Sequence, residues 1–317
     1  MINSEQTTPG RTEQPEAATP ATLLFGEMLA DVFPDRAVPG GAPFNVARHL
    51  SAFGQNPLLA SRLGDDALGA RMLEGMNAWG MDTAAVQIDK KHPTGRVLVH
   101  IEDTGHRFEI LPHQAYDFID PARAAAAASA ATPRLVYFGT LSQRHPDSRQ
   151  ALAEILRKTP APRFLDINLR EPWYDEHAVR FSLEQADIVK LNDDELRALG
   201  TMFAVHESSP QGQAAALKDR FEIKRLIVTC GGEGSWQLDQ GGDFSSAAPE
   251  SRALHILDTV GAGDAFAAAC ILGMALSWSV DIALERASAF AAAICEIRGA
   301  VPENRDFYQP FFKEWRL

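Results

Sequence analysis

Cysteine is scarce in this sequence, and basic residues do not outnumber acidic ones. Its three cysteines, Cys230, Cys270 and Cys295, are too widely spaced for a disulfide framework or a metal-binding pattern. Reduced thiols in the core, and hence a cytoplasmic location, are therefore expected. The formal net charge of −12 argues against a nucleic acid or an anionic membrane as a partner, because both attract basic surfaces.

Several segments and motifs are also missing. Residues 1–20 are polar, lack the apolar core of a signal peptide, and are expected to form a disordered tail. The alanine-rich segment 121–131 predicts a helix too short and too weakly apolar to span a membrane. The sequence contains no G-x-x-x-x-G-K-[ST], no G-x-G-x-x-G after its first strand and no H-E-x-x-H. These absences argue against a P-loop enzyme, a dinucleotide dehydrogenase and a catalytic zinc site.

The stretch from Leu254 to Leu276 has the pattern with the clearest chemistry. The apolar run Leu254–Leu257 predicts a strand, and the small and apolar segment that begins at Asp264 predicts a helix. Gly261 and Gly263 between them allow successive N–H groups to turn inward, and a following helix adds the positive end of its dipole. Such a turn binds anions, above all phosphate.

Asp264 lies at the mouth of this turn, where a carboxylate would repel a phosphate unless it had a separate task. We interpret that task as accepting a proton from an attacking hydroxyl group. The alternative is a plain helix cap, since aspartate is favoured at that position, and the turn alone does not decide between the two. At a helix N-terminus, the pKa of Asp264 is expected to be lowered.

The N-terminal half carries a second candidate site. Ala21–Gly26 predicts a strand that leads to Asp31, which could also be an ordinary solvated loop carboxylate. After Gly40 and Gly41, Asn45 stands at the head of a helical pattern, where it could bond to a ligand hydroxyl or simply cap the helix.

The middle of the chain predicts alternating strands and helices, which means βαβ units and a parallel sheet in one main domain. A separate stretch, Arg96–Leu111, alternates around Gly105 and predicts a half-exposed hairpin. The strand candidates are Leu58–Leu63, Leu135–Gly139, Arg163–Ile167, Ile188–Leu191 and Leu226–Thr229.

Polar residues close several of these strands, and ligands bind beyond the carboxyl ends of strands in a parallel sheet. For Asn192 and Glu195 the alternative is a helix cap followed by a surface glutamate. The strand-closing candidates are Asp166, Asn168 and Arg170, then Lys190, Asn192 and Glu195, then Thr229, Gly231 and Gly234.

Two motifs more than two hundred residues apart resemble one known family. D-T-V-G-A-G-D-A-F, and G-G-A-P-F-N-V-A with its spacing to Gly54 and Gly64, resemble the ribokinase-like sugar kinases, or PfkB family. The wording of the second motif most resembles fructokinases. The resemblance implies an α/β fold, a ribokinase-like three-layer α/β/α sandwich with a mainly parallel central sheet. It implies one kinase domain over 21–317, with a small β-sheet lid from about 31–40 and 94–112.

The resemblance also implies roles for the candidate residues. Asp264 would be the catalytic base, with Gly261, Ala262 and Gly263 as the anion hole. The sugar would bind to Asp31, Gly40, Gly41, Asn45, Asn168 and Arg170. ATP would bind near Lys190, Asn192, Thr229, Gly231, Gly234 and Asp258, and Glu195 would act on Mg²⁺ through water. A K⁺ requirement stays open, because the family's cation site is held mainly by carbonyl groups.

The implied reaction is ATP-dependent phosphorylation of a primary hydroxyl of a small sugar, with fructose the favoured acceptor. Ketodeoxygluconate, ribose or a nucleoside remain alternatives with the same mechanism, and a non-catalytic sugar- or nucleotide-sensing relative is an alternative of another class. The segment Asp31–Gly40 is short, so a homodimer formed through the lid is left open.

Overall fold

The computed structural model of the chain describes residues 22–102, 105–248 and 255–317. The tail expected at residues 1–20 lies outside these ranges. Within them, the fold is a large sheet between two layers of helices, with a small second sheet at one side. This is the three-layer α/β/α architecture expected from the sequence.

The central sheet has the strand order β13-β12-β11-β10-β9-β8-β1-β4-β5. The strands from β11 to β5 run parallel, and β12 and β13 add an antiparallel edge. The strands are β1 (Thr22–Phe25), β4 (Pro57–Gly64), β5 (Val86–Asp89), β8 (Leu135–Gly139), β9 (Arg163–Asp166), β10 (Ile188–Asn192), β11 (Arg225–Thr229), β12 (Ser235–Leu238) and β13 (Phe244–Ala247).

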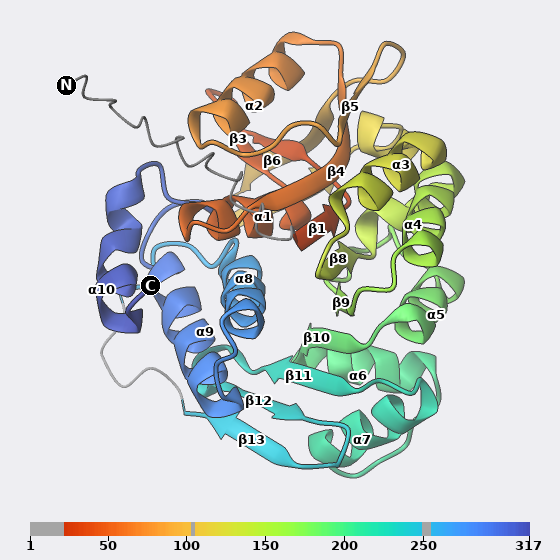
Figure 1. Cartoon of the computed structure of the whole chain (residues 1–317), viewed down its shortest axis with the longest axis vertical. Helices are drawn as coiled ribbons and strands as arrows, with labels where there is room; N and C mark the ends of the chain where they lie inside the picture. Colours follow the sequence, from red (N-terminus) through yellow and green to blue (C-terminus); the bar gives the residue numbers. More distant parts are fainter. Residues whose placement is uncertain (1–21, 103–104, 249–254) are drawn as a thin grey trace, which may run out of the picture.

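Helices cover both faces of this sheet (Figure 1). Alternate residues of a strand point to opposite faces, so Leu24 joins the core beneath one helix layer while Leu23 and Phe25 join the other. One layer holds α1 (Ala42–Ala52), α2 (Ala67–Ala78), α8 (Ala262–Ala275), α9 (Val280–Ile294) and α10 (Gln309–Trp315). The other holds α3 (Pro121–Ala131), α4 (Pro146–Lys158), α5 (Glu176–Gln185), α6 (Asp193–Met202) and α7 (Pro210–Arg220).

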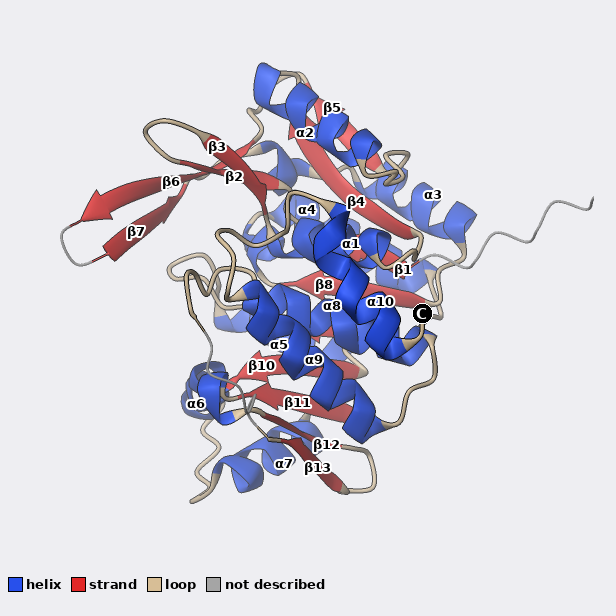
Figure 2. Cartoon of the chain, turned by 90° about the vertical axis from the view of Figure 1, so that its left-hand side faces the viewer, coloured by secondary structure: helices blue, strands red, loops and turns tan. Residues whose placement is uncertain are grey.

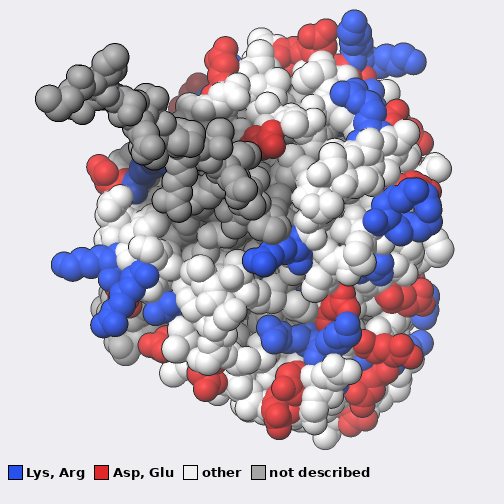
Figure 3. Space-filling model, viewed as in Figure 1, with Lys and Arg blue, Asp and Glu red and all other residues white. Residues whose placement is uncertain are grey.

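None of the helices in the described ranges has the length and apolar character needed to cross a bilayer. All three cysteines are unpaired, but only Cys270 is buried, so the expected core thiols are found at one position of three. On the face shown in Figure 3, acidic and basic side chains are interspersed rather than gathered into one basic surface.

The small sheet has the order β3-β2-β6-β7 and projects from the body of the chain (Figure 2). Its strands are β2 (Leu29–Val32), β3 (Ala37–Gly40), β6 (Gly95–Glu102) and β7 (Gly105–Ile110). β6 and β7 form the antiparallel hairpin expected from their alternation, and β2 pairs with β6 in parallel. Asp31 therefore stands on a strand of the small sheet rather than in a loop.

The strand expected at Leu254–Leu257 is a wrong prediction where it can be checked. Leu254 lies outside the described residues, and 255–257 contain no strand. Ile256 and Leu257 are 61% and 51% exposed, so their apolar character does not reflect a place in the sheet. The following helix, α8, begins at Ala262 rather than at Asp264.

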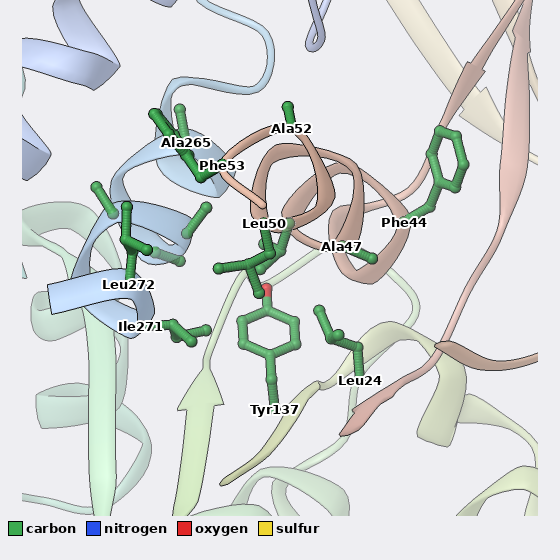
Figure 4. Close-up of a cluster of buried hydrophobic side chains, with 14 of the residues drawn as sticks. Leu24, Phe44, Ala47, Leu50, Ala52, Phe53, Tyr137, Ala265, Ile271 and Leu272 are labelled. Atoms are coloured by element: carbon green, nitrogen blue, oxygen red, sulfur yellow. The ribbon is translucent and has the colours of Figure 1, made fainter. Parts of the chain in front are cut away.

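Helices α1 and α8 pack side by side, and this contact brings the two halves of the candidate site together. In Figure 4, Leu50 of α1 lies above Tyr137 of the sheet, on the side of α1 that faces Ile271 and Leu272 of α8. The N-termini of both helices point to the same side, beyond the carboxyl end of β1.

The C-terminal helix is anchored by aromatic side chains around Phe53. The ring of Phe53 lies 5.1 Å from Phe290, 5.2 Å from Tyr308 and 5.3 Å from Trp315, measured between ring centroids. We call these four residues, together with Phe311, the C-terminal aromatic cluster. It ties α1, α9 and α10 into one core.

We expect Phe53→Ala to lower the free energy of unfolding by about 3–5 kcal/mol, because it leaves a cavity among rings that cannot collapse freely. Urea unfolding followed by circular dichroism measures this loss. Ile282→Ala, on the exposed side of α9, should change stability by about 0.5 kcal/mol or less. Equal losses in the two variants would contradict the role given to the aromatic cluster.

Candidate active site

A hydrogen bond between Asn45 and Asp264 joins the two predicted motifs. Nδ2 of Asn45 donates to Oδ2 of Asp264 at 2.8 Å. Neither side chain caps its helix, because α1 begins at Ala42 after Gly41, and α8 begins at Ala262 after Gly261. The helix-cap alternatives for both residues are therefore not what the structure shows.

The pKa of Asp264 is raised, not lowered as the sequence suggested. Burial of the carboxylate raises the pKa and outweighs the opposing effects of the Asn45 hydrogen bond and of the charges on Lys190 and Arg170. The expectation was wrong because it placed the carboxylate on the N–H groups of α8, where it does not bond. A buried carboxylate of raised pKa is a better proton acceptor than a capping one.

The Gly261–Gly263 turn, before Asp264, is closely surrounded. Gly261 has φ of +82°, and a Cβ atom there would lie 2.4 Å from Cα of Ala300. A Cβ atom on Gly263 would lie 2.9 Å from Nζ of Lys190. Glycine is thus required at position 261 by its backbone angle and by the lack of space. At position 263 the ammonium group of Lys190 occupies the space that a side chain would need.

Lys190 is buried and paired with Asp166, with 3.1 Å from Nζ to each carboxylate oxygen. Burial opposes its charge, but Asp166 and other nearby carboxylates outweigh burial and raise the pKa of Lys190. The lysine therefore keeps a positive charge behind the turn, where it would attract an anion bound to the turn's N–H groups.

On the sugar side of the predicted site, Asp31 is half-buried on β2. Burial raises the pKa of Asp31 to about 6, with Asp258 and Asp264 adding to this effect and Arg170 opposing it. A Cβ atom on Gly40 would lie 3.2 Å from Oδ2 of Asp31. Because Gly40 has no side chain, the chain before α1 can run close to the carboxylate of Asp31.

Glu27 is a residue of this region that the sequence analysis did not assign. It is 3% exposed, and burial together with the charge of Asp264 raises its pKa to about 7. Its Oε2 atom has no hydrogen-bond partner, and a Cβ atom on Gly41 would lie 2.6 Å from its backbone oxygen. The feature of the sequence that could have identified Glu27 is a lone carboxylate inside an otherwise apolar segment.

Asn168 and Arg170 lie on the loop after β9. Asn168 has φ of +40°, which bends the chain there. Arg170 is exposed and donates to the oxygen of Leu169. Its charge lowers the pKa values of Glu27, Asp31 and Asp264, so Arg170 is a cation within electrostatic range of all three carboxylates.

Asn192 and Glu195 form a capping box at the start of α6. Oδ1 of Asn192 accepts from the N–H of Glu195, and Oε2 of Glu195 accepts from the N–H of Asn192, both at 2.8 Å. Oε1 of Glu195 accepts from the N–H of Leu169 at 2.9 Å. The helix-cap alternative thus holds for the pair, but Glu195 is buried rather than on the surface. Nowhere in the described ranges do three or more His, Cys, Asp or Glu residues form a group that could hold a metal ion.

A cavity of about 290 Å³ opens beside the turn. Five of the predicted site residues line it, namely Thr229, Gly231, Gly234, Ala262 and Gly263, and its apolar wall is formed by Phe266, Ala291, Ala292 and Cys295. Lys190, Asn192 and Asp258 are not among its lining residues. Another cavity, of about 470 Å³ around Arg62 and His92, contains none of the predicted site residues.

Asp258 instead stabilises the chain around the turn. Its two carboxylate oxygens accept from the N–H of Val260 and from the N–H of Gly299, each at 3.0 Å. The segment before α8 is thereby joined to the segment after α9.

Comparison with known proteins identifies a family for the chain. Residues 20–305 match the family model of pfkB family carbohydrate kinases. The chain is 28% identical to a fructokinase of Escherichia coli over 263 residues, covering 79% of this chain and 83% of that protein. It is 28% identical to fructokinase-2 of Oryza sativa subsp. japonica over 320 residues, covering 90% and 91% of the two chains.

Two solved structures show the same fold. An uncharacterized sugar kinase from Pyrococcus horikoshii has a TM-score of 0.78 at 24% identity, and the match covers 93% of this chain and 98% of that one. A fructokinase from Vibrio cholerae O395 in fructose, ADP and calcium ion bound form has a TM-score of 0.72 at 21% identity, covering 92% and 98%.

Glu27→Gln should stabilise the protein increasingly as pH rises. A carboxyl group whose pKa rises from 4.5 to about 7 on folding contributes stability below pH 4.5, and this contribution is lost as pH increases to 7. Glutamine never ionises, so the difference in unfolding free energy between variant and wild type should grow by about 1–3 kcal/mol between pH 5 and 8.

Urea unfolding at pH 5, 6, 7 and 8 measures this difference. Glu285→Gln, at an exposed position of α9, serves as the control and should give a difference that does not change with pH. A pH-independent difference for Glu27→Gln as well would contradict the burial of an ionisable group beside Asp264.

Proposed function

The chain belongs to the pfkB family of carbohydrate kinases, and from this premise we propose that it phosphorylates fructose with ATP to give fructose 6-phosphate. The observation that carries the proposal is the Asn45–Asp264 hydrogen bond, because it joins the motif proposed to bind the sugar to the buried carboxylate proposed as the base. The names of the relatives from E. coli and rice support fructose as the acceptor.

In this proposal Asp264 accepts the proton of the acceptor's primary hydroxyl. Phosphoryl transfer proceeds through a loose transition state, so the hydroxyl becomes strongly acidic only as the phosphoryl group arrives. The raised pKa of the buried carboxylate suits that task. Asn45 holds the carboxylate in place, and Asp31, Asn45 and the glycines before α1 would position the sugar.

The transferred phosphoryl group would lie on the N–H groups of the Gly261–Gly263 turn. Lys190 supplies a fixed positive charge behind it, so charge that develops on the phosphoryl oxygens is stabilised without reorganisation. The cavity beside the turn would take the nucleotide, with its apolar wall against the base and with Thr229, Gly231 and Gly234 near the ribose and phosphates.

Mg²⁺ fits this site as an ion that enters with the nucleotide. Magnesium is usually held by substrate phosphates, water and only one or two carboxylates, so a site of this kind needs no cluster of protein ligands. Glu195 keeps its oxygens on backbone N–H groups and would act on the ion through water. When bound, the ion neutralises charge on the phosphates. We leave a K⁺ requirement and a homodimer open.

The charges around the acceptor favour a neutral sugar over an acidic one. Glu27 and Asp31 each lie within electrostatic range of Asp264, with Arg170 as the cation that offsets all three carboxylates. A ketodeoxy acid would bring a further negative charge to this region. The presence of Asp264 and of both turn glycines favours a working kinase over a non-catalytic sensor.

ADP release from the purified protein with ATP and Mg²⁺ tests the proposal. Among fructose, ketodeoxygluconate, ribose and adenosine, we expect kcat/KM to be largest for fructose, by about tenfold or more, because a mismatched polar substrate leaves buried polar groups unpaired. No ADP release with any of the four would overturn the kinase assignment, and a larger value for ketodeoxygluconate would overturn the choice of fructose.

Asp31→Ala should raise KM for fructose about ten- to a hundredfold at pH 8. A charge-assisted hydrogen bond to a non-reacting hydroxyl contributes about 1.5–3 kcal/mol to both ground and transition states. In the wild type, KM should also rise as pH falls below about 6, since Asp31 then becomes protonated.

Steady-state kinetics of both proteins at pH 5.5 and 8 measure these effects. The ratio of KM at pH 5.5 to KM at pH 8 should be smaller in Asp31→Ala than in the wild type. An unchanged KM in the variant would return Asp31 to the role of a structural carboxylate.

A further inference from the structure

We propose that His49 is a positioning residue that holds Ala300 against Gly261 and thereby fixes the phosphate-binding turn from α1. The inference rests on the proposed function, because its effect on turnover is an effect on phosphoryl transfer. Asn45 and His49 are four residues apart on α1 and so lie on one face of the helix. Asn45 bonds to Asp264, just after the turn. His49 bonds to Ala300, which packs against Gly261, the first residue of the turn.

The hydrogen bonds of His49 have a defined direction. Its Nε2 atom lies 3.2 Å from the backbone oxygen of Ala300, and its Nδ1 atom lies 2.9 Å from the hydroxyl of Tyr308. A carbonyl oxygen only accepts, so Nε2 carries the proton and Nδ1 accepts from Tyr308. His49 is completely buried. Burial and the neighbouring Arg48 lower its pKa to about 3, which keeps the ring neutral and this arrangement intact at working pH.

The position of Ala300 determines the position of Gly261, because the two residues are in direct contact. A Cβ atom on Gly261 would be only 2.4 Å from both Cα and Cβ of Ala300, so Ala300 packs directly against the backbone of Gly261. The neighbouring bonds from Gly299 and Val260 to Asp258 hold the same two segments together. Arg48 adds a bond of 3.2 Å to the oxygen of Pro302. A shift of Ala300 would therefore shift the start of the turn.

At its other end the arrangement is anchored in the C-terminal aromatic cluster. Tyr308 is buried and belongs to this cluster, and the ring of Phe290 meets the ring of His49 edge-on at 5.0 Å. A residue that only filled this space would be replaceable by an apolar ring. The two hydrogen bonds are what a ring without nitrogen atoms would lose.

His49→Phe and His49→Gln separate positioning from packing. Phenylalanine keeps an aromatic ring but leaves the Ala300 oxygen without a donor, whereas glutamine keeps an N–H group that can reach it. We expect His49→Phe to lower kcat about ten- to a hundredfold, as a small misplacement of the site does, with KM for fructose and ATP changed about threefold or less. His49→Gln should recover most of kcat.

Phe311→Leu is the matched control, because it weakens the same aromatic cluster without touching the Ala300 bond. It should lower the melting temperature but leave kcat within about twofold of the wild type. A second readout does not need kinase activity. Amide hydrogen exchange at residues 261–265 should become about tenfold or more faster in His49→Phe, but not in Phe311→Leu.

The inference is overturned if His49→Phe keeps normal exchange in the turn, or if Phe311→Leu and His49→Phe lower kcat equally. If His49→Phe does not fold, His49→Gln decides. Values of kcat and of exchange near those of the wild type support the inference. A kcat lowered and an exchange rate raised as much as expected for His49→Phe overturn it. Failure of the proposed function is distinct, since it would show as no ADP release from the wild type while the exchange measurements still test the turn.

Discussion

The hydrogen bond between Asn45 and Asp264 is the contact on which the rest of this site depends. It joins residues 219 positions apart and can form only because α1 and α8 pack side by side on one face of the sheet. The motif proposed to bind the sugar and the turn proposed to bind phosphate are thereby held next to each other.

Burial gives the site its electrostatic character. Burial raises the pKa values of Asp264, Glu27 and Asp31, and the charge of Asp264 adds to this effect for Glu27 and Asp31. Lys190 is also buried, next to the turn, and the neighbouring Asp166 raises its pKa and so keeps it positively charged. A buried carboxylate and a buried cation thus both lie close to the Gly261–Gly263 turn, where we propose that the phosphoryl group is transferred.

Much of the fold could be predicted from the sequence, because apolar runs at strand length alternate with helical patterns from β4 to β11. The two motifs also marked the N-terminal ends of α1 and α8, although α8 begins at Ala262 rather than at Asp264. The strand expected at Leu254–Leu257 failed because short apolar runs do not reveal whether a sheet partner exists, and here Ile256 and Leu257 are exposed.

The parts that could not be predicted depend on contacts between distant residues. The pKa of Asp264 was expected to be lowered, because the sequence shows a helix start but not the burial that outweighs it. Glu27 and His49 carry no motif of their own, and their importance comes from Asp264 and Ala300 lying next to them. For Asn192 and Glu195 the structure shows the helix cap that the sequence analysis gave as the alternative, but the burial of Glu195 was not visible in the sequence.

The central claim is that Asp264 is a proton acceptor rather than a structural carboxylate, and Asp264→Asn tests it most directly. Asparagine keeps the size of the side chain and an oxygen that can accept from Asn45. The account predicts that kcat with fructose falls by about 10²–10⁴, with KM nearly unchanged and the melting temperature not reduced. A near-normal kcat together with a clear loss of thermal stability would contradict it.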